Sequence, residues 1–305
     1  MNVARRSDMT RPRALVTGAN GFTGRYVVRE LEALGYEVVG LSHSHDENLP
    51  NTISVNVLDR VAMREAIASV GPKVVLHLAA IAFVAHGDVD EIYRVNIVGT
   101  RNLLEALAAL AVPPEIVVLA SSANIYGNAT VEPIVETTPP APANDYAVSK
   151  LAMEHMARLW TEKLPIVITR PFNYTGVGQS GQFLLPKIVE HFRRGDRVIE
   201  LGNTDVARDF ADVRDVARVY ARLARAKPAG QILNICTGVG TSLNEVLDLM
   251  AGIAGYRIDV RVNPTFVRAN EVRRLVGSNH ALREYIGFAP SSSLSETLAW
   301  MYAEG

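Results

Sequence analysis

The sequence has little of what marks several classes of protein. It has one cysteine in 305 residues, which excludes a disulfide framework and fits a reducing cytoplasm. Its 31 basic and 32 acidic residues nearly cancel, so neither nucleic acid nor an anionic membrane is expected as a partner. No apolar run reaches the roughly 18–20 residues of a membrane helix. Residues 1–9 lack the apolar core of a signal peptide and are expected to be a disordered tail.

What the chain does have is alternation. Short runs that are apolar along nearly their whole length, such as KVVLHLAA (73–80) and EIVVLASS (115–122), are typical of strands buried on both faces of a parallel sheet. Amphipathic helical stretches separate them, for example at 21–35, 89–110 and 145–163. This order predicts an α/β fold, a Rossmann-type doubly wound parallel sheet. The stretch PFNYTGVGQSGQF (171–183) is rich in glycine and is expected to be an irregular loop.

A glycine-rich turn follows the first predicted strand. In VTGANGFTG, Gly18, Gly21 and Gly24 lead directly into a helix. Such a turn lets a pyrophosphate approach the backbone at a helix N-terminus, so the context predicts dinucleotide binding rather than a plain tight turn. Ser42 and His43 end the second strand where an acidic residue would hold the ribose of NAD. This favours NADP, with NAD as the alternative.

A tyrosine and a lysine lie four residues apart in NDYAVSK (144–150). On a helix Tyr146 and Lys150 would share one face. A cation beside a phenol lowers the pKa of the phenol, which could then exchange a proton with a substrate oxygen. The spacing alone is weak evidence, because it also arises by chance.

Several pieces occur in one order that resembles the extended short-chain dehydrogenase/reductase family. They are TGANGFTG, Asp59, HLAA (77–80), VNIVGTRNLLEA (95–106), SSANIYG (121–127) and YAVSK (146–150). The resemblance implies an NAD(P)-binding domain formed by residues 10–172 and 208–236. It also implies a smaller mixed α/β substrate lobe formed by residues 173–207 and 237–305. No metal site is expected.

The same resemblance implies the roles of individual residues. Tyr146 is the acid/base, Lys150 binds the nicotinamide ribose and lowers the pKa of Tyr146, Ser122 bonds the substrate oxygen, and Asn96 helps to organise a water near the lysine. Asp59 would bond the adenine amine. The implied cofactor site comprises Gly18, Asn20, Gly21, Phe22, Thr23, Gly24, Ser42, His43, Val57, Leu58, Asp59, Leu78, Ala79, Ala80, Tyr146, Lys150 and Pro171.

The second half resembles the nucleotide-sugar branch of the family, in RPFNYTGVGQ, LPKIV, LGNTDVARDFADVRDVA and RANEV. The resemblance is to enzymes of GDP-mannose derivatives and implies a GDP-linked sugar as substrate. Arg208 and Arg268 would pair with the diphosphate, and Glu271 would accept from the guanosine ribose. Asn173 would contact the diphosphate or the sugar, and Lys187 would lie against the nucleotide. His86 would either touch substrate or have no role.

Two absences narrow the reaction that the resemblance implies. Asn124 stands where related dehydratases have a glutamate, and the chain lacks the cysteine and histidine that related C3/C5 epimerases use. NAD(P)H-dependent reduction of the C4 ketone of a GDP-4-keto-6-deoxy-hexose, giving GDP-D-rhamnose, is therefore expected. A 4-epimerase with tightly bound NAD and a non-catalytic dinucleotide sensor are the alternatives. A homodimer is also expected, with Val95, Leu103, Leu107, Met153, Met156 and Trp160 on its interface helices.

Overall fold

The computed structural model describes residues 11–43, 49, 51–82, 88–267 and 272–305. The predicted tail at residues 1–9 lies outside the described residues. Within them no helix is long and apolar enough to cross a membrane.

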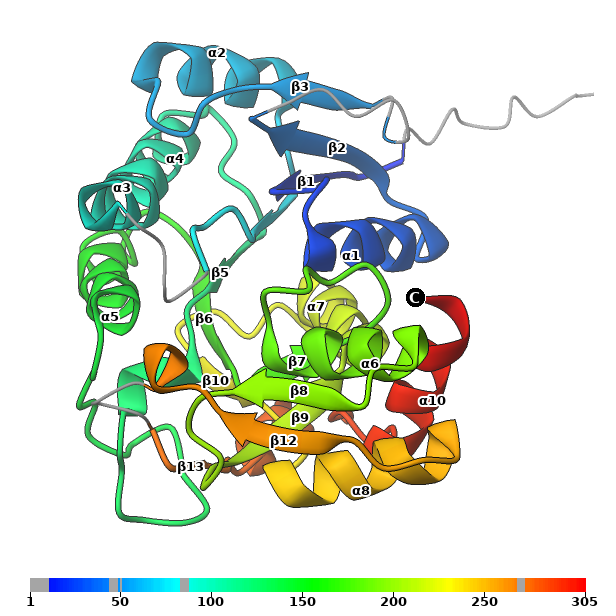
Figure 1. Ribbon diagram of the computed structural model, residues 1–305. Coiled ribbons are helices and arrows are strands. Elements are labelled where there is room, and N and C mark those ends of the chain that lie inside the picture. Colours follow the sequence, from blue (N-terminus) through cyan, green and yellow to red (C-terminus); the bar gives the residue numbers. More distant parts are fainter. Residues whose placement is uncertain (1–10, 44–48, 50, 83–87, 268–271) are drawn as a thin grey trace, which may run out of the picture.

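Seven parallel strands form the main sheet (Figure 1). Their order is β10-β6-β5-β4-β1-β2-β3, and every neighbouring pair is parallel. The strands are β1 (Arg13–Thr17), β2 (Glu37–Ser42), β3 (Thr52–Ser54), β4 (Val74–His77), β5 (Ile116–Ala120), β6 (Ile166–Pro171) and β10 (Ile232–Ile235). The direction of the strand order reverses between β1 and β4, so the loops after these two strands diverge and leave a crevice where ligands bind in such sheets.

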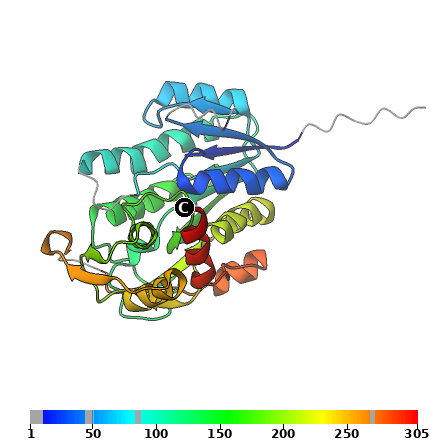
Figure 2. The same cartoon turned by 45° about the vertical axis from the view of Figure 1, so that its right-hand side comes forward.

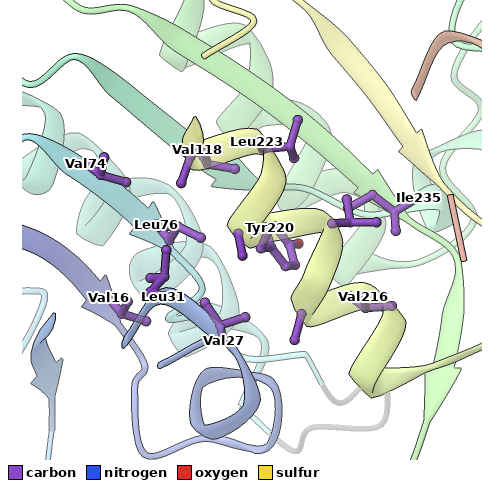
Figure 3. Close-up of a cluster of buried hydrophobic side chains, with 14 of the residues drawn as sticks. Val16, Val27, Leu31, Val74, Leu76, Val118, Val216, Tyr220, Leu223 and Ile235 are labelled. Carbon is purple, nitrogen blue, oxygen red and sulfur yellow. The ribbon is translucent and has the colours of Figure 1, made fainter. Parts of the chain in front are cut away.

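Helices cover both faces of this sheet, because the strands are apolar on both sides. One face carries α1 (Phe22–Ala33), α7 (Val213–Ala226) and α9 (His280–Ile286), whose apolar side chains form one buried cluster with β1, β4 and β5. Figure 3 shows Val27 and Leu31 of α1 and Tyr220 of α7 packed against the strands. The other face carries α2 (Arg60–Val70), α4 (Thr100–Ala108) and α5 (Asp145–Arg158).

The predicted helix at 89–110 is interrupted. It consists of α3 (Val89–Tyr93), a π-helical segment η1 (Arg94–Gly99), and α4. Within η1 Gly99 leaves no room for a side chain, since a Cβ there would lie 2.8 Å from Cγ2 of Val57. Short π-helical segments inside α-helices occur frequently at functional sites, and Asn96 lies in this one.

A second group of elements forms a lobe beside the carboxyl ends of the main sheet. Its strands are β7 (Asn173–Thr175), β8 (Val198–Leu201), β9 (Ala207–Asp212), β11 (Gly240–Ser242), β12 (Asp259–Val262) and β13 (Arg274–Leu275). Its helices are α6 (Leu184–Arg194), α8 (Leu243–Ala254) and α10 (Leu294–Glu304), which share a separate apolar core. Two 3₁₀ turns, η2 (Ala123–Tyr126) and η3 (Pro264–Phe266), complete the described elements.

The C-terminal helix joins the lobe to α1, a helix that covers the main sheet. Figure 2 shows the end of α10 beside α1. The ring of Trp300 on α10 lies edge-on to Tyr26 of α1 at 6.2 Å between centroids. Tyr26 in turn donates to the carbonyl of Val177 at 2.8 Å. The two parts of the molecule are therefore packed together on the side of the glycine turn.

The predicted fold class is confirmed, and two local expectations are wrong. Residues 173–175 form β7, which pairs with β9, rather than belonging to an irregular loop. Of the expected interface residues, Leu103, Leu107 and Met153 are buried in the core of the protomer. Their apolar character reflects packing on the main sheet. The expected domain boundaries stay a prediction.

Candidate active site

The glycine turn after β1 is a close-packed cradle. Gly18 has φ +71°, and a Cβ on it would lie 3.0 Å from the backbone of Ala79. A Cβ on Gly24 would lie 2.1 Å from the carbonyl oxygen of Gly18, so α1 approaches the turn as closely as a backbone can. Gly21 is the N-cap residue of α1 and has no side chain that could cap the helix. The first-turn N–H groups are thus available to an anion, and the turn fits the pyrophosphate of a dinucleotide.

A buried histidine links this turn to the neighbouring strand and helix. Thr100 Oγ1 donates to the carbonyl of Asn96 at 2.7 Å, so it accepts from His77 Nε2 at 2.8 Å. On the other side the N–H of Ala79 donates to Thr17 Oγ1, whose hydroxyl then faces His77 Nδ1 at 2.7 Å. Burial lowers the pKa of His77 to about 3, so the imidazole is neutral and has one fixed tautomer.

Asn96 continues this chain of hydrogen bonds to α5. Its Oδ1 accepts from the N–H of Ile81 at 3.0 Å, and its Nδ2 donates to Ser149 Oγ at 3.0 Å. Ser149 Oγ donates to the carbonyl of Tyr146 at 2.8 Å. The side chain of Asn96 therefore fixes both the loop after β4 and the first turn of α5. Its expected role in organising a water stays a prediction.

Ser122, Tyr146 and Lys150 converge at the carboxyl end of β5. Ser122 follows β5, accepts from the N–H of Asn124 at 3.1 Å, and lies near enough to the phenol of Tyr146 to lower its pKa. Lys150 Nζ donates to the carbonyl of Ala120 at 2.8 Å and lies 6.0 Å from the centroid of the Tyr146 ring. All three side chains are buried, with 6%, 7% and 4% of the residue surface exposed, respectively. Asn144 caps the N-terminus of α5 and so fixes the start of the helix, whose first turn carries Tyr146.

The electrostatics of the pair differ from the expectation. Burial raises the pKa of Tyr146 to about 12, with Ser122 opposing the shift and Tyr174 adding to it. Burial also lowers the pKa of Lys150 to about 8, and Glu154 opposes that shift. In the chain by itself burial outweighs any such lowering, because both groups are desolvated, which favours the neutral phenol. The predicted effect of Lys150 on the pKa of Tyr146 stays a prediction. At neutral pH Tyr146 holds its proton and can donate it.

The other predicted cofactor residues line the same edge of the sheet. Ser42 is buried at the end of β2, and the side chain of His43 is exposed. Asp59 is exposed and caps α2, accepting from the N–H groups of Val61 and Ala62 with one carboxylate oxygen. Its predicted bond to adenine would use the remaining oxygen and stays a prediction. Pro171 ends β6 opposite Ile235.

The predicted substrate residues lie on different elements of the lobe. Asn173 begins β7, and its Nδ2 is buried without a hydrogen-bond partner in the described part of the chain. Arg208 on β9 donates to the carbonyls of Ala207 and Arg273 at 3.0 Å each. Lys187 donates to the carbonyl of Glu200 at 2.8 Å and lies 4.5 Å from the centroid of Phe266. Arg268, Glu271 and His86 lie outside the described residues.

Several buried groups of this site were missed by sequence reasoning. His77 stands inside the quoted HLAA piece, yet a lone histidine in an apolar strand gives no signal of its two threonine partners. Tyr174 stacks on Phe22 at 6.1 Å between centroids and hydrogen-bonds Thr23 at 2.8 Å. Glu154 extends the Tyr146–Lys150 spacing by one more turn, and that signal was available. Among the described residues no cluster of His, Cys, Asp and Glu could hold a metal ion.

Comparison with known proteins gives matches over nearly the whole chain. The NAD dependent epimerase/dehydratase family matches residues 14–236. A GDP-6-deoxy-D-talose 4-dehydrogenase of Aggregatibacter actinomycetemcomitans is 35% identical over 277 residues, 90% of each chain. A GDP-6-deoxy-D-mannose reductase of Pseudomonas aeruginosa is 32% identical over 297 residues, 94% of each chain. A UDP-glucose 4-epimerase of Mycolicibacterium smegmatis is 31% identical over 304 residues, 94% of this chain and 96% of the relative.

Solved structures agree in fold. A Burkholderia cenocepacia J2315 protein, provisionally described as an epimerase, is 52% identical with a TM-score of 0.90, over 96% of this chain and 98% of that chain. RMD of Pseudomonas aeruginosa in complex with NADPH is 30% identical with a TM-score of 0.83, over 96% and 97%. MoeE5 in complex with UDP-glucose and NAD is 29% identical with a TM-score of 0.87, over 95% and 97%.

The family match covers most of the chain, and relatives above 30% identity span nine-tenths of it or more. With its parallel sheet, glycine cradle and Ser122–Tyr146–Lys150 cluster, this chain is a member of the NAD dependent epimerase/dehydratase family.

Proposed function

We propose that the protein reduces the C4 ketone of a GDP-4-keto-6-deoxy-hexose with NADPH, converting GDP-4-dehydro-6-deoxy-D-mannose to GDP-D-rhamnose. The observation that carries the proposal is the buried phenol of Tyr146, which is protonated at neutral pH and lies near Ser122 and Lys150. A buried, protonated phenol is suited to donate a proton to the oxygen of a ketone. The reverse reaction, oxidation of an alcohol, would first need the phenolate.

The class of enzyme is carried by the relatives. The chain is a nucleotide-sugar-modifying enzyme that depends on NAD or NADP, since the relatives it matches are named as reductases, dehydrogenases and epimerases of such sugars. Two of them act on GDP-linked 6-deoxy sugars by name. The absence of an acid at Ser42 and His43, and the NADPH in RMD, support NADP over NAD.

Three residues of the chain, Tyr146, Ser122 and Lys150, have roles in the proposed reaction beside the bound cofactor. A bound reduced nicotinamide supplies hydride to the carbonyl carbon. Tyr146 donates its phenolic proton to the oxygen that becomes an alkoxide, and Ser122 bonds the same oxygen and aligns it. Lys150, held by the carbonyl of Ala120, supplies positive charge beside the phenol as that proton leaves.

Binding energy far from C4 would position the ketone. Arg208 and Arg268 are assigned to the diphosphate because planar guanidinium groups form charge-assisted pairs of hydrogen bonds with such oxygens. Glu271 is assigned to the ribose diol, and Lys187 to the nucleotide. Asn173 is assigned to the diphosphate or the sugar. Its buried Nδ2, which has no hydrogen-bond partner among the described residues, supports this, because an unsatisfied amide donor is costly unless a ligand accepts from it.

Competing reactions on the same ketone are disfavoured by what surrounds it. Asn124 follows Ser122 in the η2 turn, and a carboxamide cannot exchange the proton that dehydration at C5 and C6 requires. Epimerisation next to the ketone would need an ionisable cysteine or histidine at the sugar. Cys236 is fully buried and burial raises the pKa of its thiol, so it is a core residue.

The test follows NADPH absorbance at 340 nm with GDP-4-keto-6-deoxymannose. We expect absorbance to fall with turnover, the product to be GDP-D-rhamnose, and Tyr146→Phe and Ser122→Ala to lose the activity. A product with the opposite configuration at C4 would change only the proposed identity of the product and would leave the reductase activity standing. Constant absorbance with this substrate and with its UDP and dTDP counterparts would refute the reductase.

A 4-epimerase is the second candidate, because UDP-glucose 4-epimerases match the chain nearly as fully. An epimerase returns its hydride and so keeps its cofactor. NAD recovered from the denatured protein, together with interconversion of UDP-glucose and UDP-galactose at constant absorbance, would favour it. A non-catalytic dinucleotide sensor would show neither reaction, although NADP or NAD would still raise its melting temperature.

A further inference from the structure

A buried ion pair joins α5, the helix that carries Tyr146 and Lys150, to β6. Arg170 at the end of β6 and Glu154 on α5 are joined by two hydrogen bonds, Nε to Oε1 at 3.0 Å and Nη2 to Oε2 at 2.7 Å. Their side chains are 4% and 1% exposed. Removing two charges from water is so unfavourable that a buried pair is weak evidence for stability. The pair therefore points to a role other than stabilising the fold.

The guanidinium joins three segments of the active site. Its Nη1 donates to the phenol oxygen of Tyr126 and to the carbonyl of Glu136, at 2.9 Å each. Tyr126 ends the η2 turn that Ser122 begins, and its hydroxyl donates to Asn234 Oδ1 at 2.8 Å. We call residues 122–126, which comprise Ser122 and the η2 turn, the serine turn. Arg170 thus connects the serine turn, the helix of Tyr146 and Lys150, and the strands β6 and β10. Two residues further along from Pro171, the chain reaches Asn173.

The carboxylate lies on the same helical face as the catalytic pair. Tyr146, Lys150 and Glu154 follow one another at intervals of four residues on α5. The charge of Glu154 favours the protonated form of Lys150, whereas burial lowers the pKa of that lysine to about 8. Glu154 therefore opposes the neutralisation that the buried position imposes.

We propose that Glu154 and Arg170 are positioning residues: Arg170 holds the serine turn against α5, and Glu154 supplies the counter-charge that keeps Lys150 protonated. The proposal rests on the proposed reductase function only for the reaction that serves as its assay. Neither residue touches the reacting atoms, so both act through Ser122, Tyr146 and Lys150.

The titratable groups that face Lys150 have pKa values far from that of the lysine. His77 faces it from β4, and Tyr146 and Glu154 face it from its own helix, with Arg170 and Tyr126 behind Glu154. The pKa of His77 is about 3, and the pKa values of Tyr146 and Tyr126 are about 12. We therefore expect reductase activity to decline between pH 7 and 10 as Lys150 loses its proton.

Two variants should move this decline in opposite directions. Glu154→Gln keeps the shape, removes the negative charge and leaves Arg170 unbalanced, so the midpoint should fall by about one pH unit. Arg170→Met leaves Glu154 unbalanced, so the midpoint should rise. Arg170→Lys keeps the charge and should restore the wild-type midpoint, with a lower kcat because the two-pronged geometry is lost. Damage to the fold alone would not produce shifts of opposite sign.

The control and the second readout keep the test decisive. Asp248→Asn breaks the exposed pair of Arg257 and Asp248 and should leave the midpoint unchanged. If a single variant does not fold, the double variant E154Q/R170M leaves no unpaired buried charge, and its midpoint should lie below that of the wild type. Midpoints equal to that of D248N, or shifts of the same sign in both single variants, would overturn the proposal.

The dissociation constant of NADPH, measured by fluorescence from pH 7 to 10, gives the same comparison without any sugar. Opposite shifts in cofactor binding with no reduction of any keto sugar would refute the proposed function and leave the positioning role standing. Reduction of the keto sugar without opposite shifts would do the reverse.

Discussion

The buried neutral histidine gives a prediction about acid stability that can be worked from the structure. His77 is 3% exposed, and burial lowers its pKa from 6.5 to about 3. Between these values the unfolded chain binds a proton that the folded chain does not, so stability is lost as pH falls below 6.5. From pH 7.5 to pH 5.0 the loss from this one group is about 2 kcal/mol.

The perturbation is His77→Gln, because an amide can both donate and accept between Thr17 and Thr100 but does not titrate. Wild type and variant are melted at pH 7.5 and pH 5.0, and the two falls in melting temperature are compared. All other titrating groups are shared, so the wild type should lose about 3 °C more than the variant. Equal falls would refute the assignment of His77 as a buried, neutral group, whatever the absolute stability of the variant.

Two further predictions concern the cradle and the assembly. Gly24→Ala places a Cβ 2.1 Å from the carbonyl oxygen of Gly18 and should weaken NADPH binding, measured by calorimetry, at least about tenfold. The control is Gly252→Ala in α8, where a Cβ would meet no described atom within 4 Å. It should leave NADPH binding unchanged and stabilise the protein by about 0.5–1 kcal/mol. Unchanged affinity in Gly24→Ala would contradict the close approach. The protein should form a homodimer of twice 33.2 kDa in light scattering through the exposed Val98 of η1 and Val148 of α5. Val148→Asp should give monomer while Val262→Asp does not, and a monomeric wild type would reject the dimer.

The main sheet was predictable because its strands are mostly apolar without alternation and helical stretches separate most of the consecutive strands. The lobe was less so, since β7, β11 and β13 are two or three residues long and rich in polar side chains. Their pairing with β9 depends on contacts between residues far apart in sequence. No local pattern specifies such pairing.

The candidate site divides in a similar way. The glycine spacing and the Tyr146–Lys150 interval were readable, because one turn of loop or helix fixes both. The pKa of Tyr146 was not, because burial, which raises it, is a property of the folded environment. The apolar residues Leu103 and Leu107 illustrate the same limit: helical periodicity shows that a face is buried, and not whether a sheet or a partner covers it.

The most direct test of the account is the turnover of Tyr146→Phe with NADPH and a GDP-linked 4-keto-6-deoxy sugar. If the phenol supplies the proton, kcat should fall by about 10²–10⁴-fold, while NADPH affinity and melting temperature stay close to the wild type. A variant that binds cofactor normally and reduces the ketone at the wild-type rate would contradict the account.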